Sequence, residues 1–238
     1  MIYLSITGGK MTNFNQQEFN KFVIDNSIVG FFKEPIKLKS GRMSNWYVNW
    51  RNASEDVYLI DQVSDFVISF TKDKQLKPDC FYGVPEGATK LALLCQYKWA
   101  KNSPTYSKGS HVLPMGRGKP KEHGAPKDKY FVGAPKGNVI IVEDVTTTGG
   151  SLIKTIDELS ELGVKIIAAF GLTNRMEKRD DGKNVEEAVN EKGVRYYNLS
   201  SALDLLPIVY KKEKPAEEIG KAIEEEFEKW GVKKLRIR

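Results

Sequence analysis

The stretch NVIIVEDVTTTGGSL, residues 138–152, combines side chains that suit the binding of a phosphorylated sugar. Its run of β-branched apolar residues predicts a buried parallel strand over 138–143. Ligands of α/β folds bind beyond the carboxyl ends of such strands, so the following loop is the expected site. Glycines 149 and 150 let the backbone approach a phosphate, and the start of the next helix favours its negative charge. Hydroxyl donors come from Thr146, Thr147, Thr148 and Ser151.

Two acids, Glu143 and Asp144, come directly before this loop, and their carboxylates should face a part of the ligand other than its phosphate. Carboxylates repel a phosphate, so they must face sugar hydroxyl groups or a magnesium ion. A ribose 5-phosphate meets both demands. The alternative is an ordinary strand–loop–helix connection with a Ser/Thr cap. The string GxxxxGK[ST] of phosphate-binding loops in nucleotide hydrolases does not occur.

A second chemical element is the basic segment 108–129, which we call the flap. It carries six basic residues against two acids, together with four glycines, three prolines and both histidines of the chain, His111 and His123. This composition excludes a long helix or a central strand and predicts a mobile loop. Such a loop could close over a leaving diphosphate and stabilise its charge. The alternative is a solvated basic loop. A nucleic-acid tract is disfavoured, because aromatic residues stand only at its ends, Tyr106 and Tyr130.

Composition indicates one large domain without membrane anchoring. The chain has 238 residues, 40% of them hydrophobic, and a net charge of +6, which favours anionic ligands. No apolar run is long enough to span a membrane, and the start lacks the pattern of a secretory signal. Cys80 and Cys95 lie in apolar surroundings, which predicts reduced core thiols and a cytoplasmic protein. Residues 1–14 form an expected N-terminal extension, since a second plausible start is Met11.

Hydrophobic periodicity predicts the elements that position these residues. Apolar residues at helical spacing predict helices over 15–29, 56–71, 87–100, 151–162 and 215–231. Short apolar runs predict strands over 79–84, 138–143 and 164–174, and a Ser-Gly turn predicts a hairpin within 34–51. The alternation of buried strands and helices predicts an α/β fold with a mostly parallel sheet flanked by helices.

Three motifs resemble those of a known family. VIIVEDVTTTGGS resembles the phosphoribosyl-diphosphate signature of type I phosphoribosyltransferases. LKSGRMSNWYVN (38–49) and RGKPKEHG (117–124) are similar to the N-terminal segment and the catalytic loop of orotate phosphoribosyltransferases. The motifs follow the family's order, and looser similarity extends from about residue 15 to 207. The resemblance implies a type I phosphoribosyltransferase fold with a small N-terminal hood over 15–50, a core over 55–210 and a C-terminal helix over 215–231, all one domain.

The resemblance also implies the ligands and the residues that bind them. The substrates would be orotate and phosphoribosyl diphosphate (PRPP), the product would be orotidine 5′-phosphate for UMP synthesis, and Mg²⁺ would arrive with PRPP without direct protein ligands. A homodimer with a shared active site would form, with no nucleic acid and no membrane as partner. The implied catalytic residues are Lys121, His123 and Asp144. The implied PRPP ligands are Lys39, Arg117, Lys119, Lys121, His123, Glu143, Asp144, Val145, Thr146, Thr147, Thr148, Gly149, Gly150 and Ser151. The implied orotate ligands are Lys39, Tyr47, Val48, Thr147 and Arg175, and the implied diphosphate turn is Val84, Pro85, Glu86 and Gly87.

Some positions have a second interpretation or depart from the family pattern. Tyr47 also fits a core aromatic residue of the hairpin, and Arg175 also fits a surface salt bridge. Gly118 stands where the family has a second Lys, Glu86 where bacterial relatives carry a Lys, and Asn174 where the usual residue is Asp. These departures bear on the rate and on the preferred base. Two other functions therefore stay open: transfer to another base, such as a purine, and a regulator that senses PRPP and binds nucleic acid.

Overall fold

The core of the molecule is a four-stranded, wholly parallel sheet in the order β3-β6-β7-β8. The computed structural model describes residues 13–119, 121–123 and 129–238. Strand β6 lies in the middle, with Gly83 beside Val142 on one side and Thr146 beside Asn174 on the other. The strands are β3 (Cys80–Gly83), β6 (Asn138–Thr146), β7 (Lys165–Asn174) and β8 (Tyr196–Ser201).

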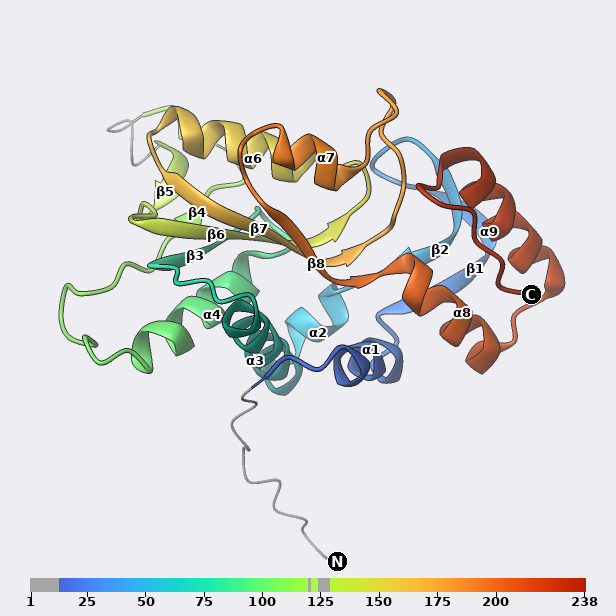
Figure 1. Ribbon diagram of the computed structural model, residues 1–238, viewed down its shortest axis with the longest axis horizontal. Helices are drawn as coiled ribbons and strands as arrows, with labels where there is room; N and C mark the ends of the chain where they lie inside the picture. Colours follow the sequence, from blue (N-terminus) through green and yellow to red (C-terminus); the bar gives the residue numbers. More distant parts are fainter. Residues whose placement is uncertain (1–12, 120, 124–128) are drawn as a thin grey trace, which may run out of the picture.

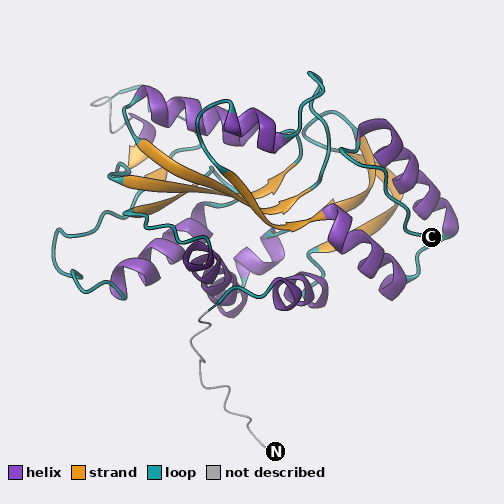
Figure 2. Cartoon of the chain, in the orientation of Figure 1, coloured by secondary structure: helices purple, strands orange, loops and turns teal. Residues whose placement is uncertain are grey.

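Helices cover both faces of this sheet, as Figures 1 and 2 show. Alternate residues of a strand point to opposite faces. Ile141 therefore packs with Leu152 and Ile156 of α6, whereas its neighbours Ile140 and Val142 pack with the helices of the other face. The first face carries α6 (Gly150–Glu161) and α7 (Val185–Asn190), and the second carries α3 (Val57–Asp73) and α4 (Thr89–Lys101). This two-sided burial explains why β6 and β7 are almost continuously apolar.

An antiparallel hairpin, which we call the hood from here on, lies beside the sheet within residues 15–50. Strands β1 (Val29–Lys37) and β2 (Met43–Val48) pair from Val29↔Val48 to Lys37↔Met43, with an irregularity between Phe31 and Ile36. Helix α9 (Glu217–Trp230) lies along this hairpin (Figure 1). The stacked rings of Trp46 and Phe227, 6.2 Å apart, join the two elements. The remaining helices are α1 (Gln16–Asp25), α2 (Arg51–Glu55) and α8 (Ala202–Glu213).

The base of the flap is a small antiparallel pair, β4 (Met115–Gly116) and β5 (Phe131–Val132). Above it, the Arg117 and Lys121 amides donate to the carbonyl groups of Tyr130 and Lys129. The described part of the flap therefore contains no long helix and no strand of the main sheet, as its glycines and prolines predicted. Residues 1–12 of the expected extension, and Lys127 and Asp128 of the flap, lie outside the described residues.

The predicted fold class is confirmed, as is each predicted helix, strand and hairpin, with ends shifted by a few residues. Strand β6 runs to Thr146, beyond the predicted end at residue 143, so Asp144, Val145 and Thr146 also belong to the strand. Helices α2, α7 and α8, the edge strand β8 and the short strands β4 and β5 were not predicted from the sequence. Within the described residues, no helix is long and apolar enough to cross a membrane.

Candidate active site

The loop between β6 and α6 has the geometry of a phosphate site. Gly149 adopts a φ of +72°, a left-handed conformation that glycine adopts without steric cost, and α6 begins at the next residue. Within the described part of the chain, no side chain caps this helix start, so its amide groups face the loop. Unpaired N–H groups at the positive end of a helix bind anions. The loop thus offers backbone donors to a phosphate.

The hydroxyl groups around this loop divide into two sets. Thr147 and Thr148 are partly exposed, and the Ser151 hydroxyl accepts a hydrogen bond from Lys39 at 2.9 Å. Thr146 differs from the expectation, because its buried hydroxyl pairs with that of Tyr196 at 2.6 Å on the β8 side. Its side chain therefore fixes β6 against β8, and its carbonyl accepts a hydrogen bond from the Arg175 amide at 2.8 Å, so the open loop begins at Thr147.

The two carboxyl groups beside the loop have different environments. Glu143 is only 7% exposed, whereas Asp144 is partly exposed and accepts a hydrogen bond from the Val145 amide at 2.8 Å. Burial, followed by the charge of Asp144, raises the pKa of Glu143 to about 9. At neutral pH Glu143 therefore holds a proton that it can donate.

The hood reaches the phosphate loop through one lysine. Lys39 lies in the turn between β1 and β2, and its hydrogen bond to Ser151 spans 112 positions in the sequence. A cavity of about 460 Å³ lies beside this contact. Five predicted ligand residues line it, namely Lys39, Val84, Pro85, Arg117 and Ser151. The cavity thus brings together residues from the hood, the predicted diphosphate turn, the flap and the phosphate loop.

The predicted diphosphate turn after β3 lies close to Asp144 and to the flap. Its peptide bond between Pro85 and Glu86 is cis. A Cβ atom on Gly87 would come within 2.5 Å of Asp144 Oδ2, so this turn packs closely against that carboxylate. A Cβ atom on Gly118 would come within 2.5 Å of Glu86 Oε1. The two departures from the family pattern, Glu86 and Gly118, are therefore direct neighbours.

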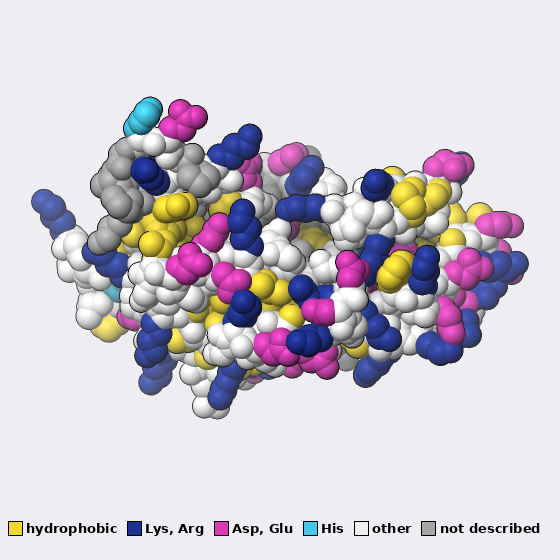
Figure 3. All heavy atoms as spheres, turned by 90° about the horizontal axis from the view of Figure 1, so that it is seen from above, with side chains coloured by type: hydrophobic (Ala, Val, Ile, Leu, Met, Phe, Trp, Pro, Cys, Tyr) yellow, Lys and Arg dark blue, Asp and Glu magenta, His cyan; other side chains and the backbone are white. Residues whose placement is uncertain are grey.

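The other flap residues named from the sequence lie on the surface. Lys119, Lys121 and His123 are exposed. Figure 3 shows Lys and Arg side chains mixed with acidic ones over the face that α6 and α7 cover. The net positive charge is thus not gathered into one basic stripe on this face.

Two of the predicted orotate ligands, Tyr47 and Val48, lie in β2 and pack against neighbouring residues of the hairpin. The Tyr47 ring packs against the Phe32 ring at a tilt of 42°, with centroids 4.7 Å apart, and lies over Gly30, where any side chain would collide with it. Val48 pairs with Val29 and packs against the main core. These contacts agree with a hairpin core aromatic at position 47, and they leave Tyr47 and Val48 partly exposed.

Arg175 is only 2% exposed, so its salt bridges are internal rather than on the surface. Its Nε donates to Glu177 at 2.7 Å, and its Nη2 donates to Ser44 at 2.9 Å and to Glu226 at 3.0 Å. The guanidinium also lies over the Trp46 ring, 3.6 Å from its centroid. Its amide donates to the Thr146 carbonyl at 2.8 Å, which ties it to the phosphate loop.

Two charged residues, Arg179 and Glu226, contact residues of the candidate site and were not predicted from the sequence. Arg179, in the loop after β7, donates from Nη1 to the Thr148 carbonyl and from Nε to Asp181 at 3.3 Å. Glu226 reaches Arg175 from a helix about 50 positions further along the chain. The run NRMEKRDD gave only a general signal of charge, and nothing in the sequence pairs Glu226 with Arg175. Both contacts depend on the tertiary fold.

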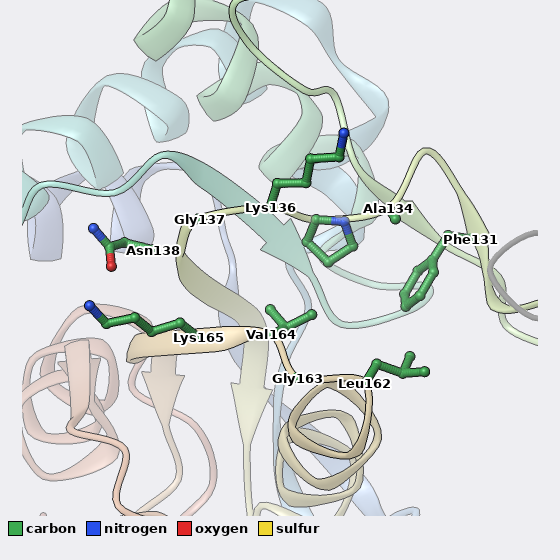
Figure 4. Close-up of a pocket in the computed structure, with 10 residues that line it drawn as sticks. Phe131, Ala134, Lys136, Gly137, Asn138, Leu162, Gly163, Val164 and Lys165 are labelled. Carbon is green, nitrogen blue, oxygen red and sulfur yellow. The ribbon is translucent and has the colours of Figure 1, made fainter.

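A second hollow of about 450 Å³ lies at the opposite end of the strands, where β6 and β7 begin (Figure 4). Lys136 and Lys165 extend from its rim, while Phe131, Leu162 and Val164 supply apolar walls. None of the residues predicted to bind ligand lines it. Because ligands of parallel α/β folds bind at the carboxyl ends of the strands, the first cavity is the better candidate for the active site.

The fold and this site define the class of the protein. Residues 134–197, which contain β6, the phosphate loop, α6, β7 and α7, match the phosphoribosyl transferase domain family. The chain is thus a phosphoribosyltransferase with the type I fold. Its fold is similar to that of the orotate phosphoribosyltransferase of Francisella tularensis, with a TM-score of 0.64, 19% identity and coverage of 90% of this chain and 99% of that one.

Sequence relatives define the family more narrowly. The orotate phosphoribosyltransferase of Rhodopseudomonas palustris (strain BisB5) is 32% identical over 183 residues, which are 74% of this chain and 89% of that protein. That of Pyrococcus abyssi is 26% identical over 190 residues, which are 80% and 94% of the two chains. The chain belongs to the orotate phosphoribosyltransferase family.

Proposed function

We propose that this chain transfers the phosphoribosyl group of PRPP to orotate, giving orotidine 5′-phosphate and diphosphate in UMP synthesis. The observation that carries this proposal is the hydrogen bond from Lys39 to Ser151 beside the 460 Å³ cavity. It joins the hood to the phosphate loop, so motifs that are distant in the sequence form one site. Family membership supports the choice of orotate as the base.

The phosphate loop and the two acids would hold PRPP. The backbone at Thr147, Thr148, Gly149 and Gly150, with the Ser151 hydroxyl, would bind the 5′-phosphate. Asp144 would accept hydrogen bonds from the ribose hydroxyl groups, and protonated Glu143 could donate one. Positioning of the two substrates then supplies much of the rate, because the reacting atoms are held in line.

Bond exchange at ribose C1 requires stabilisation of the leaving group. The bond from C1 to the diphosphate oxygen breaks, the bond from C1 to orotate N1 forms, and the N1 proton leaves. The C1 centre passes through an oxocarbenium-like state, as in other glycosyl transfers. Arg117, Lys119, Lys121 and His123 of the flap would stabilise the departing diphosphate. Lys39 would contact PRPP and orotate, and Tyr47, Val48, Thr147 and Arg175 would contact orotate.

Magnesium fits this site as a companion of PRPP. Among the described residues, no group of three His, Cys, Asp or Glu side chains could hold a metal ion. Mg²⁺ commonly binds through one or two carboxylates, water and substrate phosphates, and the partly exposed carboxylate of Asp144 suits such a role. The ion would neutralise part of the charge of the diphosphate.

Two further properties belong to this proposal. The chain would act as a homodimer in which the flap of one subunit serves the site of its partner. It would function in the cytoplasm, an inference supported by its two buried free thiols, Cys80 and Cys95.

The test is orotate consumption, followed by its ultraviolet absorbance with PRPP and Mg²⁺ present. A Lys121→Ala variant should lose at least about 100-fold in kcat, because a flap cation at the leaving group acts in the transition state. Lys108→Ala, which removes an exposed charge near the start of the flap, is the matched control. Turnover of another base in place of orotate would overturn the substrate assignment. PRPP binding without turnover of any base would favour the regulator.

A further inference from the structure

Helix α9 brings a carboxylate, Glu226, into the hydrogen-bonding shell of Arg175. The Glu226 side chain is 8% exposed and accepts hydrogen bonds from Arg175 Nη2 at 3.0 Å, Trp46 Nε1 at 3.1 Å and the Ser44 hydroxyl at 2.9 Å. Figure 1 shows α9 beside the β1–β2 hairpin that carries Ser44 and Trp46. The guanidinium proposed to bind the substrate thus already holds a carboxylate from the protein.

The charges around Glu226 are balanced before any ligand enters. Arg175 also binds Glu177, and Glu177 accepts a second ion pair from Arg42 at 2.9 Å. Arg42 lies over the Trp230 ring and pairs with the exposed Asp180 at 3.1 Å. Two buried guanidinium groups therefore face two buried carboxylates. A further anion would leave an unpaired charge in a region where charge is costly to bury.

We propose that Glu226 is a specificity-determining residue of the base site, which exchanges with the carboxylate of an acidic base on Arg175 and takes up a proton as it does so. This inference rests on the proposed function, in which Arg175 contacts orotate. In the exchange, the ion pair between Arg175 and Glu226 breaks, an ion pair between Arg175 and the orotate carboxylate forms, and one proton passes from solvent to Glu226. The number of buried charges then stays constant.

The properties of Glu226 fit such an exchange near neutral pH. Burial and, to a smaller extent, the charge of Glu177 raise its pKa to about 7, against the lowering effects of Arg175 and of the hydrogen bonds from Ser44 and Trp46. If Arg175 paired with the carboxylate of a ligand instead of with Glu226, its lowering effect on the pKa of Glu226 would be lost. The ligand would also bring a second negative charge close to Glu226, so the pKa of Glu226 would rise further. A group whose pKa rises on binding takes up a proton, and the affinity falls as pH increases above its ligand-free value.

The test compares two ligands that differ by one carboxylate. Binding of orotidine 5′-phosphate and of uridine 5′-phosphate is measured by calorimetry at pH 7 and pH 8, in buffers with different ionisation enthalpies. The first ligand should take up more protons than the second, by about half a proton at pH 7 and up to about one at pH 8, and its relative affinity should fall up to about fivefold between the two pH values. Effects of the phosphate and of Glu143 are common to both ligands and cancel.

Glu226→Gln isolates the residue, because the amide keeps the shape of the side chain and cannot titrate. The proton difference and the pH dependence should disappear in this variant and persist in Glu225→Gln, an exposed neighbour on the same helix. Equal proton uptake for both ligands in the unaltered chain would overturn the inference whether or not the variant folds. Persistence of the difference in folded Glu226→Gln would also overturn it. If neither ligand binds and orotate is not consumed, the proposed function fails and this inference fails with it.

Discussion

The buried acid Glu143 should make the ligand-free protein less stable as pH rises. Its pKa lies at about 9 in the folded chain, compared with about 4.5 for an ordinary glutamate. The folded state therefore binds a proton that the unfolded state releases, so the stability cost begins near pH 4.5 and grows until about pH 9. Between pH 4.5 and pH 7, at about 1.4 kcal/mol per unit, this cost reaches on the order of 3 kcal/mol.

Glu143→Gln removes that cost while keeping the shape of the side chain. For a chain of this size, 1 kcal/mol corresponds to about 2–4 °C, so the variant should melt roughly 6–12 °C above the parent at pH 7. At pH 5 the cost is below about 1 kcal/mol, and the difference should be within roughly 2–3 °C. Thermal unfolding followed by circular dichroism at both pH values measures this. Glu34→Gln, an exposed residue of β1, is the control.

Two results would refute this explanation. A melting difference that is the same at pH 5 and pH 7 would mean that Glu143 does not change its protonation on folding. A variant that is less stable than the parent at pH 7 would mean that the ionised carboxylate contributes favourable contacts. The gain in stability should come with weaker PRPP binding, because Glu143 is proposed to contact the ribose.

Three other changes test the phosphate loop and its supports. Gly149→Ala places a side chain at φ +72° against Val185. It should therefore cost about 1–2 kcal/mol of stability and weaken PRPP binding, as measured by calorimetry. A second substitution, Val185→Ala, in the same chain should restore part of the stability and part of the binding. Lys39→Met should raise the KM for PRPP about tenfold in steady-state kinetics, with an unchanged melting temperature because the residue is exposed. Arg179→Ala removes the hydrogen bond to the Thr148 carbonyl and should raise the KM for PRPP more than that for orotate; equal effects on both would contradict a local role.

The main sheet was predictable because its strands have simple patterns. The apolar runs before Gly83, Glu143 and Asn174 are buried on both faces, and this produces continuous hydrophobic sequences that read as parallel strands. Strand β8 was not predicted, because YYNLSS mixes polar and aromatic residues at the edge of the sheet. Its assignment depends on the pairing of Ala169 with Tyr196, which only the fold shows.

The geometry of the candidate site was predictable where it depends on the local backbone. It was not predictable where it depends on partners that are distant in the sequence. The loop Thr147–Ser151 follows a strand and begins a helix, so its geometry is local and the sequence determines it. The Thr146 hydroxyl belongs to the same run, yet it pairs with Tyr196, 50 positions away. Hydroxyl-rich composition cannot show which side chain turns toward the ligand, because that choice depends on the neighbouring strand.

Arg175 connects the two halves of the site. Its amide belongs to the ladder that supports the phosphate loop, and its guanidinium holds the hood through Ser44 and α9 through Glu226. A change in what the guanidinium binds therefore affects the hairpin that carries Lys39, and Lys39 in turn contacts Ser151. An acidic base that displaces Glu226 would act on the hood as well as on Arg175. The contacts proposed to orient orotate would then also adjust Lys39, the lysine proposed to contact PRPP.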